Sequence, residues 1–332
     1  MNTSFFNAKI NIGDSMNNKT TFLISGICSL LIIFTVANVN KISNLLVNSL
    51  EENPKIVKET KSIYALNESF DYVKTTTDFT PLSFQDLKDI IYTTVDSGWN
   101  NFTFYCPNEY TNCVKDITKI TNDQEILTHL NNFVSPYNSF SNIKTTISDS
   151  GEITLDINYL YTEEKINAIN KKINEIIKNN ITDEMDDYEK IKTIHDYIIN
   201  NAKYDVKRNN DNTSEYDSYT AYGPLIEGYA TCNGYTDAMA LFLNKFGYKN
   251  FKIATTPDDK NLTGHIWNAV YLNNKWLHLD VTWDDPVSED GKDYLLHKYF
   301  LITDDELKKA DEGKVIVTEH NYLKNIYSEF KN

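Results

Sequence analysis

Apolar residues recur along this chain with two periods, one typical of strands and one typical of helices. In residues 151–161, GEITLDINYLY, apolar and polar side chains alternate, which predicts a half-buried strand. Isoleucines then recur at helical spacing over 166–180, and a second helical stripe covers roughly 186–200. His195 lies beside the apolar face of that second helix, and we interpret it as a packing residue. The pattern therefore predicts a strand followed by two amphipathic helices.

Between residues 76 and 150 the pattern is mixed and indicates a small accessory α+β region. Ser83 is placed to cap a helix, and Thr121 is placed to cap another. The segment NFTFYC at 101–106 predicts a short strand. No motif in this region points to a particular chemistry.

Residues 21–39, TFLISGICSLLIIFTVANV, form one uncharged and mostly apolar run. A helix of this length spans a bilayer core of ~30 Å. Flanking lysines favour a cytoplasmic N-terminal tail over residues 1–20, and the polar residues 40–75 are typical of a stalk. A cleaved signal peptide and a buried core helix are the alternatives. We expect a single-pass protein of the cell membrane with an extracytoplasmic body, which would be secreted if the segment were cleaved.

Composition narrows the classes of partner. The chain has 332 residues, a formal net charge of −15 and one arginine, Arg208. Because nucleic-acid binding requires clustered positive charge to neutralise phosphates, a nucleic-acid partner is excluded. The length allows one or two folded units besides the apolar run.

The four cysteines differ in their surroundings. Cys28 lies within the apolar run, where a thiol behaves as a small hydrophobic group. Cys106 and Cys113 enclose the short segment CPNEYTNC, and a disulfide between them is chemically permitted in an extracytoplasmic region. Cys232 has no obvious partner, so its thiol requires another explanation.

Cys232 lies at the predicted start of a helix. Thr231 is a suitable N-cap, and Gly247 is a suitable end of the helix. The unpaired N–H groups and the positive end of the helix dipole in the first turn favour an anion, and the thiolate is the reactive form of cysteine. A nucleophile is therefore one interpretation of Cys232, and a buried structural cysteine is the other.

Two apolar segments that flank Asn273 and Asn274 predict a β-hairpin. If these asparagines form a two-residue loop, Leu272 pairs with Lys275. The same register is then fixed along both strands, because a slip of one residue would move every side chain to the opposite face.

On this register Trp267 faces Asp280 and His265 faces Thr282. His265 and Asp280 thus lie on one face as diagonal neighbours, whose side chains are able to meet. Asp280 would orient the imidazole of His265, and the other ring nitrogen would activate Cys232 and later protonate a leaving amine.

These residues lie within three blocks that closely resemble bacterial transglutaminase-like domains of the papain superfamily, and the resemblance covers roughly residues 155–305. The blocks are EKIKTIHDYIINNAKYD, GYATCNGYTDAMALFLNKFGY and GHIWNAVYLNNKWLHLDVTWDDP. The resemblance implies an α+β fold, a papain/transglutaminase-like core in which the nucleophile-bearing helix packs on an antiparallel sheet. This catalytic domain would occupy residues 151–332, after the anchor and the accessory region. It also implies that Cys232 is the nucleophile, His265 the general base and Asp280 its orienting residue.

The resemblance further assigns four residues to the oxyanion site or the cleft. They are Tyr222, Trp267, Asn268 and Trp283. Thr236 departs from the family pattern, since a small residue is frequent at this position.

The expected activity is acyl transfer through a thioester on Cys232. We favour a peptidase or amidase that acts on cell-wall or surface proteins, with protein or peptide substrates that include peptidoglycan peptides. Cross-linking of protein glutamine to an amine is one alternative, and a non-catalytic wall- or protein-binding module is another.

No catalytic metal and no cofactor are expected. Acidic pairs at 284–285 and 288–290 offer oxygen ligands for calcium, but we prefer to interpret them as a solvated loop because the spacing of an EF-hand is missing. The segment TDDE at 303–306 predicts a capping box at the start of a short helix. The remaining histidines, at 129, 278, 297 and 320, show no spacing typical of metal ligands.

Overall fold

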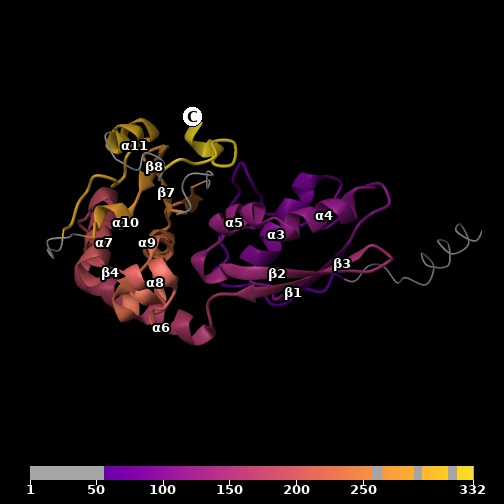
Figure 1. Ribbon diagram of the computed structural model, residues 1–332, viewed down its shortest axis with the longest axis horizontal. Coiled ribbons are helices and arrows are strands. Elements are labelled where there is room, and N and C mark those ends of the chain that lie inside the picture. The colour runs from indigo at the N-terminus through magenta and orange to yellow at the C-terminus, as the bar shows by residue number, and fades with distance from the viewer. Residues whose placement is uncertain (1–55, 256–263, 288–293, 313–319, 332) are drawn as a thin grey trace, which may run out of the picture. The chain divides into compact units, whose positions relative to one another are not determined.

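Two antiparallel sheets, one short parallel pair of strands and the helices around them make up the computed structural model (Figure 1). It describes residues 56–255, 264–287, 294–312 and 320–331. The residues from Lys55 to Asn332 form one compact unit. The apolar run at 21–39 lies outside the described residues, and among those residues no helix is long and apolar enough to cross a membrane.

The first half of the described chain contains a three-stranded antiparallel sheet with β3 in the centre, in the order β1–β3–β2. Helices α3 and α4 lie on one side of these long strands (Figure 1). The elements are α3 (Phe84–Asp96), β1 (Asn101–Tyr105), α4 (Cys113–Asn122), α5 (Gln124–Asn132), η1 (Pro136–Asn138), β2 (Phe140–Ile147) and β3 (Glu152–Tyr159).

Of the two capping residues predicted in this half, one is confirmed and the other is wrong. Ser83 caps α3 by accepting a hydrogen bond from the Asp86 N–H, as predicted. Thr121, however, lies within α4, and Asp123 is the residue that caps α5. The carboxylate of Asp123 accepts hydrogen bonds from two N–H groups of the next turn, which a residue still inside a helix cannot do.

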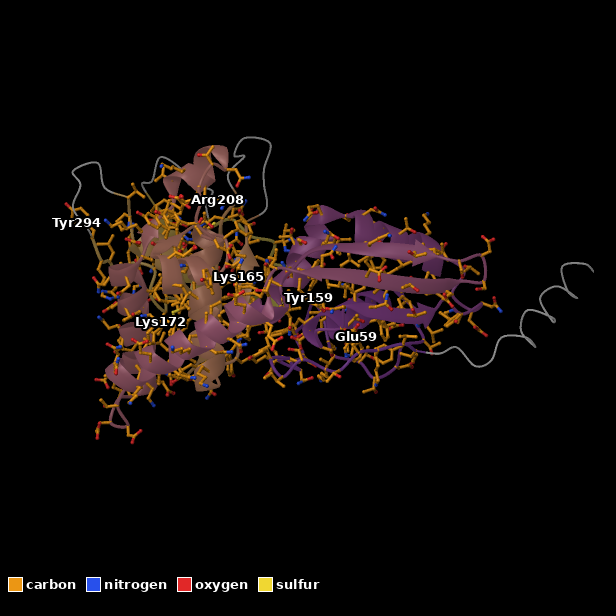
Figure 2. All side chains as sticks on the ribbon, turned by 90° about the horizontal axis from the view of Figure 1, so that it is seen from below. Glu59, Tyr159, Lys165, Lys172, Arg208 and Tyr294 are labelled. Carbon is orange, nitrogen blue, oxygen red and sulfur yellow. A yellow bond between two sulfur atoms is a disulfide. The ribbon has the colours of Figure 1, made fainter. Side chains whose placement is uncertain are left out.

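Strand β3 joins the first sheet, although we had expected residues from 151 onward to belong to the second region. Its buried side chains Ile153, Leu155 and Ile157 confirm the predicted alternation. The alternation shows that one face is buried but does not identify the neighbouring strands. Figure 2 shows Tyr159, the last residue of β3, where the strands meet the helical half.

The second half places helices around a sheet in the order β6–β7–β8, in which both pairs of strands are antiparallel. Its first elements are α6 (Glu163–Asn180), α7 (Asp187–Asn201), β4 (Lys203–Tyr204), α8 (Val206–Asp211), η2 (Gly223–Glu227), β5 (Tyr229–Ala230) and α9 (Cys232–Phe246). The others are β6 (Asn250–Ala254), β7 (Ile266–Leu272), β8 (Lys275–Leu279), α10 (Val281–Asp284), α11 (Asp304–Asp311) and η3 (Ser328–Lys331).

The β6–β7–β8 sheet separates two apolar cores. Side chains of one face, such as Phe251 and Ala269, join the core of the first sheet and the C-terminal segment. Side chains of the other face, such as Val270 and Leu279, pack with α6, α7 and α9. The expected arrangement of helix α9 on an antiparallel sheet is therefore confirmed, and α5 lies against the same sheet at β6.

The hairpin has the predicted register, since Leu272 pairs with Lys275 and Asn268 with Leu279. Both loop asparagines have positive φ, as this turn requires. The ladder ends at the pair Asn268–Leu279, three pairs before the expected pair of His265 and Thr282. Asp280 caps the short helix α10, so His265 and Thr282 are not cross-strand partners. The side chain of Asp280 receives the N–H of Trp283, and this cap turns the chain out of the strand.

Cys106 and Cys113 form the disulfide that the sequence allowed. It closes the loop between β1 and α4, and Cys113 is the first residue of that helix. The capping box of Thr303 and Glu306 at the start of α11 is likewise confirmed.

Candidate active site

Helix α9 begins at Cys232, as the sequence predicted, and ends at Gly247 in the left-handed conformation. Thr231 stands at the N-cap position, but its hydroxyl donates to the carbonyl of Ser218 instead of capping the helix. Among the described residues Cys232 is the free cysteine, and it is partly exposed. The first-turn N–H groups of α9 therefore surround a thiol that solvent reaches.

The loop before the helix comes very close to this first turn. A Cβ atom built on Gly234 would lie 2.3 Å from the carbonyl oxygen of Ser218 and 3.1 Å from that of Thr220. Only glycine allows the loop and helix to approach this closely. This contact places Tyr219, the residue between them, beside Cys232.

His265 lies just before β7 and contacts Asp280 just after β8. Its Nε2 is 2.5 Å from Oδ2 of Asp280, and both side chains are buried. The hairpin thus brings together two residues that are 15 positions apart. Since Nε2 is occupied by the carboxylate, Nδ1 is the ring nitrogen available to the Cys232 thiol.

The charges in this group reinforce one another. Burial opposes the charged form of His265, but the Asp280 carboxylate and the Cys232 thiol outweigh it and raise the pKa of His265 to about 10. Burial of Asp280 acts against its charge, yet the His265 and His320 side chains hold the pKa of this carboxyl well below its usual range. At neutral pH the imidazole is therefore cationic and favours a thiolate beside it.

This coupling predicts a pH dependence of the free energy of unfolding. The folded-state pKa of His265 is above its ordinary value of 6.5, so its contribution is complete below pH 6.5 and is lost as pH rises towards about 10. Asp280 has the opposite shift, so its contribution is lost as pH falls. Urea unfolding of the wild type and of His265→Gln should give a stability difference that shrinks between pH 6.5 and 10. A difference that stays constant across this range would contradict the assignment.

His320 is a member of the site that the sequence did not indicate. Its Nε2 lies 2.9 Å from Oδ2 of Asp280, and its Nδ1 lies 3.0 Å from both carboxylate oxygens of Asp311. His320 is 40 positions from Asp280, in the C-terminal segment, so no local spacing could have revealed the contact. Asp280 is consequently held between two imidazoles.

The ligand atoms of His265, Asp280 and His320 lie within 4.8 Å of one another, which is close enough to hold a cation. The observed distances are those of hydrogen bonds that orient the histidines. The acidic pair at 284–285 is not arranged as a calcium site, because Asp284 and Asp285 are buried and accept hydrogen bonds from Tyr299 and Tyr235. Residues 288–290 lie outside the described residues.

A pocket of about 450 Å³ opens at Cys232 and His265. Its other lining residues come from both halves of the chain. From the accessory half, α5 contributes Gln124, Glu125, Thr128 and His129. The helical half contributes Tyr219, Asn233, Ala254, Thr255, Gly264 and Ile266. The accessory region therefore supplies one wall of the pocket.

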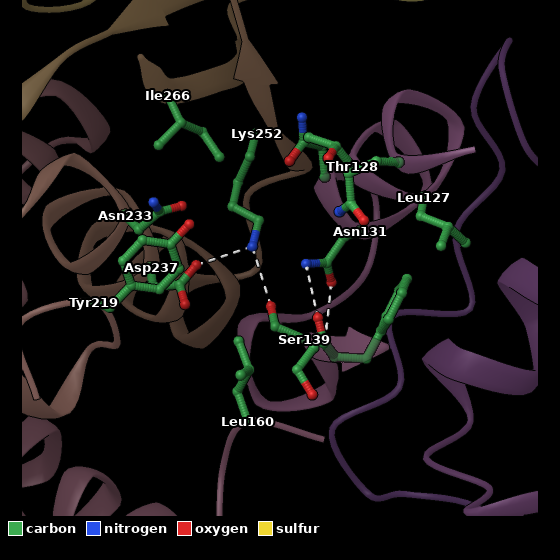
Figure 3. Close-up of a pocket in the computed structure, with 14 residues that line it drawn as sticks. Leu127, Thr128, Asn131, Ser139, Leu160, Tyr219, Asn233, Asp237, Lys252 and Ile266 are labelled. Carbon is green, nitrogen blue, oxygen red and sulfur yellow. Dashed lines mark hydrogen bonds and ion pairs between the residues drawn. The ribbon is translucent and has the colours of Figure 1, made fainter. Parts of the chain in front are cut away.

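A second pocket of about 250 Å³ shares Thr128, Tyr219 and Asn233 with the first (Figure 3). Figure 3 shows Lys252 reaching towards Asp237 and Ser139. Its ammonium is 2.9 Å from the Asp237 carboxylate and 3.1 Å from the Ser139 hydroxyl. This buried ion pair ties helix α9 and strand β6 to the segment before β2.

Tyr222, which we expected near the oxyanion site, lies elsewhere. It immediately precedes η2 and packs against the core of the helical half, and the Lys165 ammonium lies 5.8 Å from its ring. Tyr219 is the tyrosine that lines the Cys232 pocket. Although about half of the Tyr219 side chain is exposed, loss of solvent around its hydroxyl raises the pKa of Tyr219, and the nearby Cys232 raises it further. Its hydroxyl therefore remains a donor at neutral pH.

The other three expected cleft residues support the site and are not among the described residues that line the pocket. Trp267 stacks on His265 with ring centroids 5.7 Å apart, and Trp283 meets the same imidazole edge-on at 6.4 Å. Asn268 is buried and donates to the carbonyl of Thr236 on α9. Thr236, the departure from the family pattern, donates to the Ile266 carbonyl, so both residues fasten α9 to β7.

Residues 174–281 match the model of the transglutaminase-like superfamily, and this part of the chain is therefore a transglutaminase-like domain. The matched segment contains Cys232, His265 and Asp280. The match, together with a free thiol beside a histidine, supports a cysteine-dependent enzyme in general. No curated protein matches the chain.

Three solved structures show limited similarity. A crystal structure of a TGase is 14% identical with a TM-score of 0.32, and the match covers 46% of this chain and 48% of that one. A candidate cysteine protease from Cytophaga hutchinsonii is 14% identical with a TM-score of 0.27, over 43% and 62% of the two chains. A candidate protease from Parabacteroides distasonis is 15% identical with a TM-score of 0.25, over 47% and 40%. In each case less than two thirds of the solved chain is covered.

Proposed function

We propose that this chain is a cysteine-dependent acyl-transfer enzyme that acts as a peptidase or amidase on proteins or peptides. The observation that carries the proposal is the position of His265, whose imidazole lies between the Cys232 thiol and the Asp280 carboxylate at one pocket. A nucleophile, a base and an orienting group in this order are what covalent acyl transfer requires.

In the first step the Cys232 sulfur attacks the carbonyl carbon of a peptide or glutamine amide. In this proposal the oxyanion is stabilised by the N–H groups at the start of α9 and by the hydroxyl of Tyr219, a residue that lines the pocket. His265 donates its proton to the leaving nitrogen as the C–N bond breaks, which leaves a thioester on Cys232. Water then attacks the thioester carbonyl, its proton passes to His265, and the C–S bond breaks to release the acid.

Amine transfer is the second candidate, and Glu125 is the observation that favours it. This exposed carboxylate lines the pocket that contains Cys232 and would attract the ammonium of a lysine acceptor. A lysine amine that replaces water in the second step would give a cross-link. The charge of Glu125 is screened where solvent reaches it, so hydrolysis remains our first proposal.

We further propose that the enzyme acts outside the cytoplasm, attached to the cell membrane through the apolar run at 21–39, and that wall peptides or surface proteins are its substrates. The Cys106–Cys113 disulfide supports this location, because disulfides persist in oxidising compartments.

The direct test incubates the full-length chain with model peptides, peptidoglycan peptides and a glutamine-containing protein, with and without a fluorescent primary amine. Mass spectrometry should detect cleaved or deamidated products and an acyl adduct on Cys232. Cys232→Ala should give neither. Incorporation of the amine in place of hydrolysis would support cross-linking. A wild type that forms no adduct and no product on any of these substrates, and binds them unchanged, would support a non-catalytic binding module.

Because α5 supplies one wall of the Cys232 pocket, a larger side chain on this helix should hinder the entry of a protein substrate. Thr128 is partly buried and lines both pockets. Thr128→Trp should raise KM for a protein substrate by about tenfold or more, because the larger side chain fills the pocket. Labelling of Cys232 by small iodoacetamide should change little. The matched control is Thr118→Trp, an exposed position on α4, and equal effects of the two substitutions would contradict a role of α5 in substrate binding.

A further inference from the structure

A second cluster of histidine and carboxylate groups lies among residues that do not line the Cys232 pocket. His195 and Asp196 come from α7, and His297 comes from the segment that follows α10. Oδ1 of Asp196 is 2.9 Å from Nδ1 of His195 and 2.6 Å from Nε2 of His297. The three ligand atoms lie within 4.8 Å of one another.

Two different elements thus direct imidazole nitrogens at one carboxylate. Asp196 and His297 are 101 positions apart, so the fold and not the local sequence creates the cluster. The His195 and His297 rings also lie close together, with centroids 5.3 Å apart and planes inclined by 36°.

The environment of His195 supplies an independent observation. Its Nε2 forms no hydrogen bond within the described residues but lies 3.3 Å from Oδ2 of Asp284, and both side chains are fully buried. Asp284 is itself fixed, since it accepts the backbone N–H of Tyr299 at 3.0 Å. A histidine that binds a metal through one ring nitrogen usually donates the other N–H to a carboxylate, which sets the tautomer and the ring orientation.

We propose that Nδ1 of His195, a carboxylate oxygen of Asp196 and Nε2 of His297 bind a divalent cation of the zinc class. Two imidazoles and one carboxylate form a donor set typical of zinc, whereas calcium and magnesium prefer oxygen ligands alone. The solvent-exposed part of His297 leaves room for water as the fourth ligand.

The distances from Asp196 to the two imidazole nitrogens would increase by less than about 1 Å when zinc binds. Zinc binds nitrogen and oxygen ligands at ~2.0–2.2 Å in a tetrahedron, which places neighbouring ligand atoms ~3.3 Å apart. The present separations of 2.6 and 2.9 Å from Asp196 would increase by about 0.7 and 0.4 Å to reach this spacing. His297, which is one-third exposed, has freedom to make this movement.

The site would serve as a structural clamp. It would join α7 to the segment that carries His297, and through His195 and Asp284 it would reach α10, whose N-cap is Asp280. This role is separate from the proposed chemistry at Cys232 and does not depend on it.

The test measures zinc bound to the untagged full-length chain by equilibrium dialysis, together with thermal unfolding. We expect the wild type to bind one zinc ion, and we expect His297→Gln and Asp196→Asn to bind none. A hundredfold excess of zinc over Kd should raise Tm by ~5 °C in the wild type and not in these variants. Because the first cluster could also hold a cation, His265→Gln is the matched control and should keep the zinc.

Cobalt substitution provides a check on the ligands. The cobalt form should lack a thiolate charge-transfer band, because Cys232 does not take part. Circular dichroism of the apo variants should match that of the wild type, since His297 is partly exposed and its replacement leaves α7 intact. Loss of zinc from His265→Gln with retention in His297→Gln would overturn the proposal, and so would a wild type that binds none.

Discussion

Replacement of His265 by glutamine is expected to slow alkylation of Cys232 by iodoacetamide at neutral pH by about 10- to 100-fold. The raised pKa of His265 keeps its imidazole cationic, and this charge favours the reactive thiolate. Turnover of an amide substrate should fall further, by about 10⁴-fold, because the same group must protonate the leaving nitrogen. Alkylation rates by mass spectrometry and kcat/KM measured in parallel separate the two effects.

The matched control is His297→Gln, which removes a histidine outside the pocket, with EDTA present in both samples. It should leave alkylation and turnover near the values of the wild type. Equal alkylation rates in His265→Gln and the wild type would exclude His265 as the partner of Cys232.

Replacement of Asp280 by asparagine is expected to lower kcat by about 10³-fold or more. The uncharged amide no longer stabilises the imidazolium of His265, and it allows the wrong tautomer. The substitution should also reduce stability by about 3 kcal/mol, because it leaves two buried histidines beside a neutral group. Kinetic assays and urea unfolding measure the two losses.

The variant His320→Gln separates two contributions of Asp280 to catalysis, the charge of its carboxylate and the orientation of that carboxylate. We assign His320 as a positioning residue, because its Nε2 contacts the same oxygen of Asp280, Oδ2, that contacts His265. Glutamine retains a donor there, so kcat should fall by about tenfold with little change in KM, and the pH profile should shift because the Asp280 carboxyl loses an imidazole that lowers its pKa. A loss in His320→Gln as large as that in Asp280→Asn would contradict this division of roles.

Local sequence patterns predicted the parts of the site that belong to single elements. Thr231 and Gly247 marked the ends of α9 and thus placed Cys232 in its first turn. The two asparagines fixed the hairpin register, which brought His265 near Asp280. These predictions succeeded because caps and two-residue turns depend on residues a few positions apart.

Other features depended on contacts between distant segments. The 3.6-residue stripe of α5 did not show that this helix forms a wall of the Cys232 pocket, and the alternation in β3 did not identify its sheet. We assigned Tyr222, and not Tyr219, to the cleft. The position of Tyr219 beside Cys232 depends on the close packing of Gly234 against the loop at 218–220, which the local sequence does not show.

By itself, the sequence determined a helix that begins at Cys232, a hairpin that carries His265 to Asp280, and a disulfide-compatible pair of cysteines. Periodicity, capping residues and turn residues specify such elements, because the interactions behind them are local. The tertiary structure alone decided that His320 contacts Asp280, that α5 lines the pocket, and that His195, Asp196 and His297 meet. These contacts join segments many residues apart, and the burial of shared apolar surface brings such segments together without a local signature.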